Sequence, residues 1–248
     1  MKFAIIAAGE GSRLAAEGIE APKPLVKVNG ECLIDRLIRI FLNNDAEEIV
    51  CICNDRTAQV ASHLAALQRD GLQGRPVPLR FMVKSTPSSM HSFFEISRYL
   101  DDGPFVLTTV DTMFHEDEFA AYVSDFRKEH TAALMGVTDY IDDESPLYVE
   151  TDKQLNITAF LDHADACRYI SAGIYGLQPS AVFTLANCIA RGEKRMRNFQ
   201  RALVADGNKL RAWPFSKVFD IDHAADIAKA AAYLSQLNTE TKQDTSWK

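Results

Sequence analysis

Short apolar runs alternate with amphipathic stretches through the first half of this chain, and that alternation limits its possible folds more than any other feature. The runs have the length of buried strands and predict strands over residues 3–8, 49–53, 79–83, 104–110 and 132–137. Between them, apolar residues recur three and four positions apart, as at Ile34, Leu37, Ile38 and Phe41, and predict helices. This order is typical of an α/β fold, a three-layer, doubly wound, mostly parallel sheet with helices on both faces.

The pattern changes in the second half, where three strands separated by short turns are expected over residues 147–151, 156–161 and 169–177. We interpret the region from about 140 to 178 as a small, partly antiparallel insertion. Two helices, a strand at the sheet edge and a closing helix should follow, over residues 180–190, 196–206, 210–214 and 224–237. The chain is predicted to form a single domain over residues 1–237, with a polar tail over residues 238–248.

The first predicted strand stops abruptly at Gly9, and small or polar residues follow as far as Arg13. Ligands of doubly wound sheets bind at the carboxyl ends of the strands. Glycine lets backbone N–H groups approach anionic oxygens, and Arg13 and Lys23 would add positive charge. An ordinary strand-to-helix turn explains the two glycines of this loop equally well, but the arginine and the lysine favour a polyphosphate site.

Two widespread glycine motifs do not fit this loop. A dinucleotide-binding fingerprint needs a third glycine where the chain has Leu14. A P-loop needs Gly-Lys followed by Ser or Thr where the chain has Gly11-Ser12-Arg13. The sequence therefore excludes these two common ways of holding a nucleotide.

The stretch from Ala8 to Leu14, followed by Pro22-Lys23-Pro24-Leu25, resembles the paired signature of sugar-phosphate nucleotidyltransferases. These are the NDP-sugar pyrophosphorylases and the related enzymes that make CDP-linked alcohols. The resemblance runs from residue 1 to about 234 and implies a Rossmann-like nucleotidyltransferase fold. It implies that Arg13 grips the outer phosphates of an NTP and that Lys23 lies near its α-phosphate, both as catalytic residues. The NTP itself would be held by the loop residues Ala8, Gly9, Glu10, Gly11 and Ser12.

Asp111 directly follows a predicted buried strand, where a carboxylate can meet a ligand. By position alone, a turn residue or a helix cap is the more common interpretation. The resemblance implies instead that Asp111 holds the catalytic Mg²⁺, together with Asp222 or, as an alternative, Asp220. Asp226 is better suited to the first turn of the last helix, where the dipole favours it, and His223 is expected to be a bystander.

Ser88 and Ser89 lie between a predicted strand and helix, where relatives contact the base and the phosphates. The segment lacks the Gly-Thr-Ala form found in many of them. It is closer to the version seen in phosphocholine and other alcohol-phosphate cytidylyltransferases. Both serines are therefore nucleotide-binding candidates, although a serine-rich helix start explains them equally well.

The acceptor side departs from the family pattern. Sugar-1-phosphate enzymes carry Glu-Lys-Pro after the second inserted strand, where this chain has Asp162-His163. Asp162 could replace the glutamate, but a histidine poorly replaces a permanently charged lysine. Gly173 matches the strand at which a sugar approaches the backbone. The acceptor phosphate could instead use Lys194, Arg195 or Arg197, unless the basic run 191–197 is a solvated helix end.

The bulk composition fits a globular enzyme of 248 residues. A net charge of −7 argues against a nucleic-acid-coating protein, and no apolar run approaches the ~20 residues of a membrane span. Five cysteines without a metal-type pair indicate free thiols in a reducing compartment, so we expect a cytoplasmic protein. Its partners would be an NTP and a phosphorylated acceptor, with a homo-oligomer possible and neither nucleic acid nor membrane involved.

These expectations combine into Mg²⁺-dependent nucleotidyl transfer from an NTP to a sugar-1-phosphate or similar phosphorylated acceptor, with release of pyrophosphate. Nucleotide-sugar or glycoconjugate synthesis would be the setting. The alternative is a catalytically inactive subunit that binds a nucleotide or sugar nucleotide and regulates another enzyme. The changed Asp162-His163 segment motivates that alternative, whereas the retained Asp111 and Asp222 argue against it.

Overall fold

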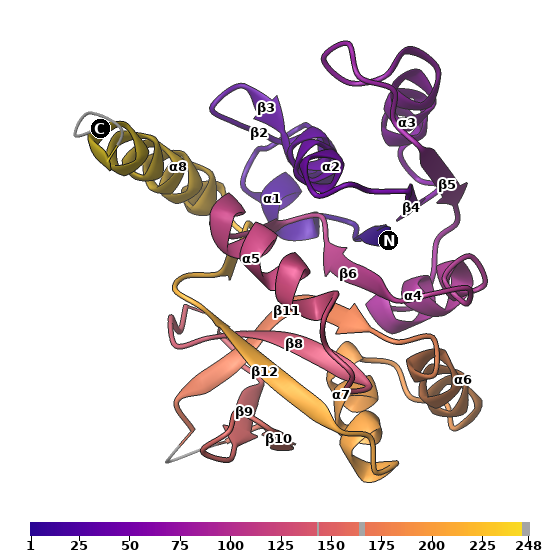
Figure 1. Cartoon of the computed structure of the whole chain (residues 1–248). Coiled ribbons are helices and arrows are strands. Elements are labelled where there is room, and N and C mark those ends of the chain that lie inside the picture. Colours follow the sequence, from indigo (N-terminus) through magenta and orange to yellow (C-terminus); the bar gives the residue numbers. More distant parts are fainter. Residues whose placement is uncertain (143, 164–166, 245–248) are drawn as a thin grey trace.

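The computed structural model describes residues 1–142, 144–163 and 167–244 (Figure 1). Its main sheet has the strand order β10-β9-β11-β6-β1-β4-β5, with β8 paired to β11 and β12 paired to β8. The strands are β1 (Lys2–Ala7), β4 (Glu48–Cys53), β5 (Leu79–Val83), β6 (Phe105–Thr109), β8 (Ala133–Thr138), β9 (Tyr148–Thr151), β10 (Ile157–Leu161), β11 (Tyr169–Leu177) and β12 (Leu210–Phe215). The helices are α1 (Ser12–Ala16), the 3₁₀ helix η1 (Lys23–Leu25), α2 (Leu33–Asn43), α3 (Ala58–Asp70), α4 (Ser89–Ser97), α5 (Glu116–Phe126), α6 (Ala181–Ala190), α7 (Met196–Ala205) and α8 (Ala224–Asp244).

Helices cover both faces of the sheet, which confirms the predicted three-layer fold (Figure 1). Strand β1 shows how the sequence produces this, because its side chains alternate between two apolar clusters. Phe3 and Ile5 pack with α2, α3 and α5, whereas Ala4 and Ile6 pack with α4, α6 and α7. Strands β6, β1, β4 and β5 run parallel, as the strand–helix alternation predicts.

Strand β11 occupies a place that the sequence pattern does not reveal. It lies between β6 and β8 and runs antiparallel to both, so the last strand of the expected insertion is a central strand of the main sheet. Its nearly continuous burial fits that central position. Strands β9 and β10 continue the antiparallel part beyond it, and β12 is the predicted edge strand, where Pro214 is tolerated.

The last helix is longer than predicted, since α8 continues past residue 237 to Asp244. The polar residues beyond 237 include neither glycine nor proline, so no strong stop signal ends the helix there. Residues 245–248 of the predicted tail lie outside the described part. The five cysteines are free, and within the described ranges no helix has both the length and the apolar character that a bilayer span requires.

A two-stranded ribbon positions the carboxylates that the sequence singles out. It consists of β7 (Thr112–Met113) and β13 (Phe219–Asp220), which run antiparallel. The N–H of Ile221 donates to the carbonyl of Asp111 at 3.1 Å. The ribbon therefore joins segments that are far apart in the sequence at the carboxyl end of β6.

Candidate active site

The loop after β1 brings its backbone close to the segment that carries Lys23. Gly11 directly precedes helix α1 with φ 61° and ψ 28°, a left-handed conformation that favours glycine. A Cβ atom at Gly11 would lie 3.2 Å from the Cβ of Lys23. Asn54 supports the loop from β4 by donating to the carbonyl of Gly9 at 3.1 Å. The glycine at position 11 thus permits the close approach of loop and lysine that a joint phosphate site needs.

Lys23 is held between two of the predicted metal carboxylates. Its ammonium donates to Asp111 and, at 2.7 Å, to Oδ1 of Asp222. Arg13 donates to the other oxygen of Asp222 at 2.9 Å. Burial alone would lower the pKa of Lys23, but the charges and hydrogen bonds of Asp111 and Asp222 outweigh it and raise the pKa. Four predicted residues therefore form one charged cluster.

Asp220 is the third carboxylate of this cluster. Asp220 lies at the C-terminal end of β13. Its side chain is exposed toward the cavities and surrounded by protein on its other sides. This enclosure, followed by the negative charge of Asp111, raises the pKa of Asp220 to about 8, although Lys23 and a hydrogen bond with Thr112 act in the opposite direction. The positive charge of Lys23 is thus not enough to offset the burial of Asp220 and the negative charge of Asp111.

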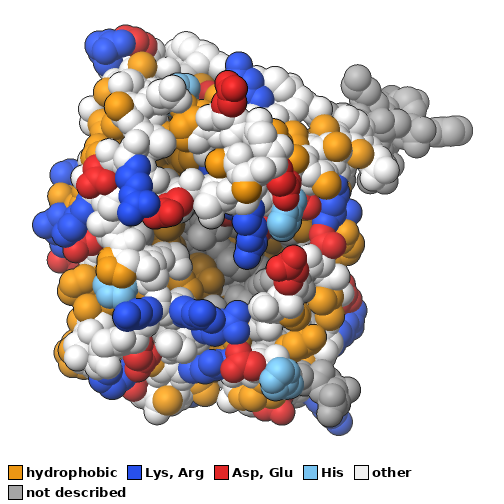
Figure 2. Space-filling view, turned by 180° about the vertical axis from the view of Figure 1, so that it is seen from behind, with side chains coloured by type: hydrophobic (Ala, Val, Ile, Leu, Met, Phe, Trp, Pro, Cys, Tyr) orange, Lys and Arg blue, Asp and Glu red, His pale blue; other side chains and the backbone are white. Residues whose placement is uncertain are grey.

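Two cavities meet at the cluster. The smaller, about 400 Å³, is the glycine-loop cavity, and the larger, about 460 Å³, is the β11 cavity because Ile170–Gly173 and Tyr175 line it. Asp220, Thr109 and Ser89 line both. Figure 2 shows one face of the molecule with a central hollow bordered by basic and acidic side chains. Two neighbouring cavities with a shared wall can hold two reactants against each other.

The glycine-loop cavity is lined by most of the predicted nucleotide-side residues, namely Ala8, Gly9, Glu10, Gly11, Lys23, Ser88, Ser89 and Asp111. Ser12 does not line it and instead begins α1. Arg13 and Asp222 line the β11 cavity rather than the glycine-loop cavity. The hydroxyl of Ser88 and Nδ1 of His91 form a hydrogen bond of 2.9 Å. This bond fixes the start of α4 beside the cavity.

On the acceptor side, Gly173 lines the β11 cavity but Asp162 lines neither cavity. Gly173 has φ 69°, and the pairing of β11 with β8 is irregular between Ser171 and Tyr175. This bulge opens the strand toward the cavity. Asp162 instead accepts from Arg197 and Arg201, each at 2.8 Å.

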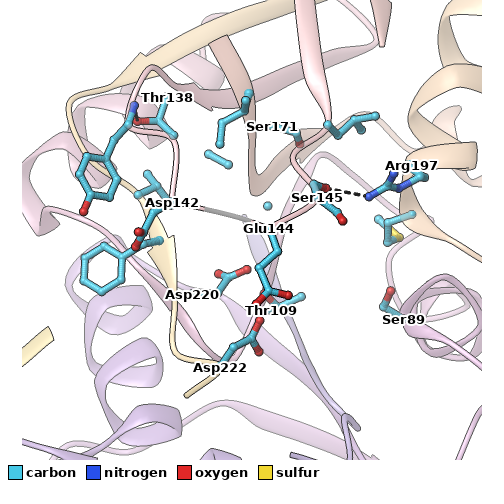
Figure 3. A pocket seen from close by; sticks show the side chains of 18 of the residues that line it. Ser89, Thr109, Thr138, Asp142, Glu144, Ser145, Ser171, Arg197, Asp220 and Asp222 are labelled. Carbon is cyan, nitrogen blue, oxygen red and sulfur yellow. Dashed lines mark hydrogen bonds between the residues drawn. The ribbon is translucent and has the colours of Figure 1, made fainter. Parts of the chain in front are cut away.

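Several lining residues were not predicted. Asp142, Glu144 and Ser145 come from the loop after β8, and Figure 3 shows Glu144 directed toward Asp220 and Asp222. The acidic run at 142–144 is visible in the sequence, but nothing in the pattern places it at this cavity. Arg195 and Arg197, which the sequence offered as alternatives, line the β11 cavity, whereas Lys194 does not.

His223 helps to hold the segment that leads into α8. Its Nδ1 lies 2.6 Å from Glu17, which also accepts from the N–H of Ala224 at 2.6 Å. Asp226 accepts from the N–H groups of Asp222 and His223 at 3.0 and 2.8 Å, which fits its predicted place in the first turn of α8. These contacts fix the segment that carries Asp222.

The carboxylates fit a Mg²⁺ ion that substrate phosphates help to hold. Among the described residues, no group of three or more His, Cys, Asp or Glu side chains is arranged to hold a metal without a substrate. Asp111 and Asp222, however, already share one cation, the ammonium of Lys23, and Asp220 is a third carboxyl group beside them. One or two carboxylates together with substrate phosphates is the usual environment of Mg²⁺.

The family model described as "Nucleotidyl transferase" matches residues 2–237. The chain belongs to this nucleotidyl transferase family. The match spans nearly the whole chain and confirms the family that the two N-terminal motifs indicate, and with it a nucleotidyltransferase activity.

Two solved structures share the fold of this nucleotidyltransferase. One is the inositol-1-phosphate CTP transferase from T. maritima, with a TM-score of 0.74 and 19% identity over 91% of this chain and 90% of that one. The other is a protein from Bacillus anthracis assigned as a glucose-1-phosphate thymidylyltransferase and solved with a sucrose. Its TM-score is 0.79, with 20% identity over 94% of each chain.

Proposed function

We propose that this nucleotidyltransferase moves a nucleotidyl group from an NTP to the phosphate of a sugar-1-phosphate or a similar phosphorylated acceptor. The observation that carries the proposal is the meeting of two cavities at Asp220 and Thr109, beside the cluster of Lys23, Asp111 and Asp222. The NTP would occupy the glycine-loop cavity and the acceptor the β11 cavity. Likeness to enzymes that act on inositol-1-phosphate and glucose-1-phosphate is consistent with this class of acceptor.

The chemistry is an in-line displacement at the α-phosphorus. An oxygen of the acceptor phosphate forms a new bond to that phosphorus, and the bond to the bridging oxygen of pyrophosphate breaks. Pyrophosphate leaves with the electron pair, so the protein needs no nucleophile of its own. Its task is to hold two anions together and to offset their repulsion.

Lys23 and Arg13 are two fixed positive charges available for this task. Lys23 is anchored on Asp111 and Asp222, so its ammonium is oriented before a substrate arrives. Arg13 lies on the β11 side of Asp222, where it can contact phosphate that spans the two cavities. Asp111 and Asp222 would hold Mg²⁺, with Asp220 as the alternative to Asp222. When bound there, the ion would neutralise charge on the reacting phosphates.

This assignment also weighs against an inactive regulatory subunit. A protein that only binds nucleotides has no need for a lysine clamped between two carboxylates at the junction of two cavities. The charged cluster is complete in this chain.

The test is pyrophosphate release, measured for each NTP against a panel that includes glucose-1-phosphate, inositol-1-phosphate and phosphocholine. We expect one combination to release pyrophosphate, to stop when EDTA removes divalent metal, and to resume when excess Mg²⁺ is added. Release that continues unchanged in EDTA would contradict the role given to Mg²⁺. Nucleotide binding with no pyrophosphate from any acceptor would instead favour the regulatory subunit.

A further inference from the structure

The wall of the β11 cavity needs a source of positive charge if a phosphorylated acceptor is to enter. Its lining includes the carboxylates of Asp142, Glu144, Asp220, Asp222 and Asp226. Two of these are offset in the protein, since Lys229 contacts Asp142 and Lys23 contacts Asp222. A phosphate monoester would still be repelled unless cations on the opposite wall attract it.

The N-terminal end of α7 provides such cations. Arg195 lines the cavity and, among the described residues, has no hydrogen bond or ion pair that uses its guanidinium. Arg197 also lines the cavity and donates to Asp162 at 2.8 Å. It also donates to the carbonyl of Ser145 at 3.0 Å (Figure 3). Asp162 is shared with Arg201, so one carboxylate faces two guanidinium groups. Together with Arg195, the group carries two positive charges in excess, and these can attract the negative charge of a phosphate monoester.

The backbone of the same helix end adds to this charge. Arg195, Met196 and Arg197 form the first turn of α7 and its cap, and all three line the cavity. No side chain caps this helix, which is ten residues long. The first N–H groups of an uncapped helix carry partial positive charge and bind anions.

Gln200, one turn further along α7, points to a ligand independently of these charges. Its side chain is only 2% exposed, yet it lines the β11 cavity. Its Oε1 accepts from the hydroxyl of Ser171 at 2.9 Å. Within the described part of the chain, its amide nitrogen donates no hydrogen bond, and it is not among the fully enclosed polar atoms, so it is accessible from the cavity. The amide is thus a preformed donor that faces the cavity.

We propose that Arg195 and Arg197 of helix α7, with the amide of Gln200, hold the phosphate of the acceptor in the β11 cavity. In this arrangement Asp162 contacts no acceptor and instead orients Arg197. The helix α7 site takes the place of the lysine that the family pattern would put at His163. This inference rests on the proposed function for its choice of ligand, but its test does not require turnover.

The test uses inorganic phosphate as the probe. Protein is first saturated with an α,β-methylene NTP analogue and Mg²⁺, so that the glycine-loop cavity is filled and no transfer can occur. Phosphate is then titrated while thermal unfolding is followed, with sodium chloride at matched ionic strength as the reference. Arg195→Gln and Arg197→Gln are compared with the wild type and with Lys194→Gln. The lysine variant is the matched control, because Lys194 is the adjacent cation and does not line the cavity.

We expect phosphate to stabilise the wild type and Lys194→Gln, and we expect affinity to fall about tenfold or more in each arginine variant. Arg195→Lys should recover part of the affinity, and affinity for the NTP analogue should be unchanged throughout. A wild type that phosphate does not stabilise, or arginine variants that keep full affinity, would overturn the proposal. Failure of the proposed function has a different signature, namely phosphate binding that depends on Arg195 in a protein that releases no pyrophosphate.

Discussion

At the scale of single residues, Lys23 connects the parts of the site. Its ammonium lies between Asp111 and Asp222, two residues that reach it from opposite parts of the chain. The two N-terminal motifs predict Lys23 and Arg13 as functional residues, and strand ends predict Asp111. No sequence pattern predicts that one ammonium bridges both carboxylates, because contacts between residues 199 positions apart depend on the whole fold.

Asp222→Ala tests the assignment of the second metal carboxylate. We expect turnover to fall ~100-fold or more, because the variant loses a group that anchors both Lys23 and Mg²⁺. The melting temperature should change little, since the Asp222 side chain is 41% exposed. Pyrophosphate release and a circular-dichroism melt measure the two effects. Wild-type turnover in Asp222→Ala, with loss only in Asp220→Ala, would assign the metal to the alternative residue.

At the scale of elements, sequence periodicity predicts strands well and their neighbours poorly. The expected strand over residues 169–177 coincides with β11, and the one over residues 79–83 coincides with β5. The apolar residues of β11 therefore predict that this strand is buried. They do not predict its place between β6 and β8, because periodicity shows which face is buried but not which strand lies alongside.

The contact between β11 and α5 gives a prediction about packing. A Cβ atom at Gly176 would lie 2.8 Å from the ring of Phe126 and from the hydroxyl of Tyr122, both buried. Gly176→Ala should therefore lower the free energy of unfolding by ~1–3 kcal/mol, the usual cost of overpacking. Urea denaturation measures it, with Gly103→Ala as the control because nothing lies within 4 Å of a Cβ there. Equal stability of the two variants would show that β11 and α5 are not packed this closely.

At the scale of the whole molecule, the two cavities differ in how far the sequence reveals them. The glycine-loop cavity is built mainly from one continuous segment and from strand ends, and most of its predicted residues line it. The β11 cavity combines the loop after β8, the bulge of β11 and the start of α7. These come together only through the sheet order, so the sequence could not predict Glu144 or Gln200 as lining residues.

An ion-pair network that joins α2, α5 and the segment of Glu31 predicts how stability depends on pH. Arg39 of α2 contacts Glu31 at 2.7 Å and Glu116 of α5 at 2.8 Å. Burial alone would raise the pKa of Glu116, but its hydrogen bonds with Arg39 and the charge of Arg36 outweigh burial and lower the pKa. A lowered folded-state pKa stabilises the protein above the ordinary value of 4.5 and loses that stabilisation as pH falls through the folded value.

The free energy of unfolding should therefore fall as the pH is lowered from about 5 to about 3, and by less in Glu116→Gln than in the wild type. Urea denaturation at a series of pH values measures both slopes. A variant that follows the same pH dependence as the wild type would show that Glu116 is not linked to folding in this way.

The central claim is that Lys23, clamped by Asp111 and Asp222 at the junction of two cavities, serves the transfer of a nucleotidyl group. The most direct measurement is the turnover number of Lys23→Ala, at saturating NTP and acceptor, by pyrophosphate release. Loss of a preorganised cation at the reacting phosphates predicts a fall of ~100-fold or more, with the circular-dichroism spectrum unchanged. A folded Lys23→Ala protein with turnover within about twofold of the wild type would contradict the account, because the lysine would then contribute almost nothing to the transition state.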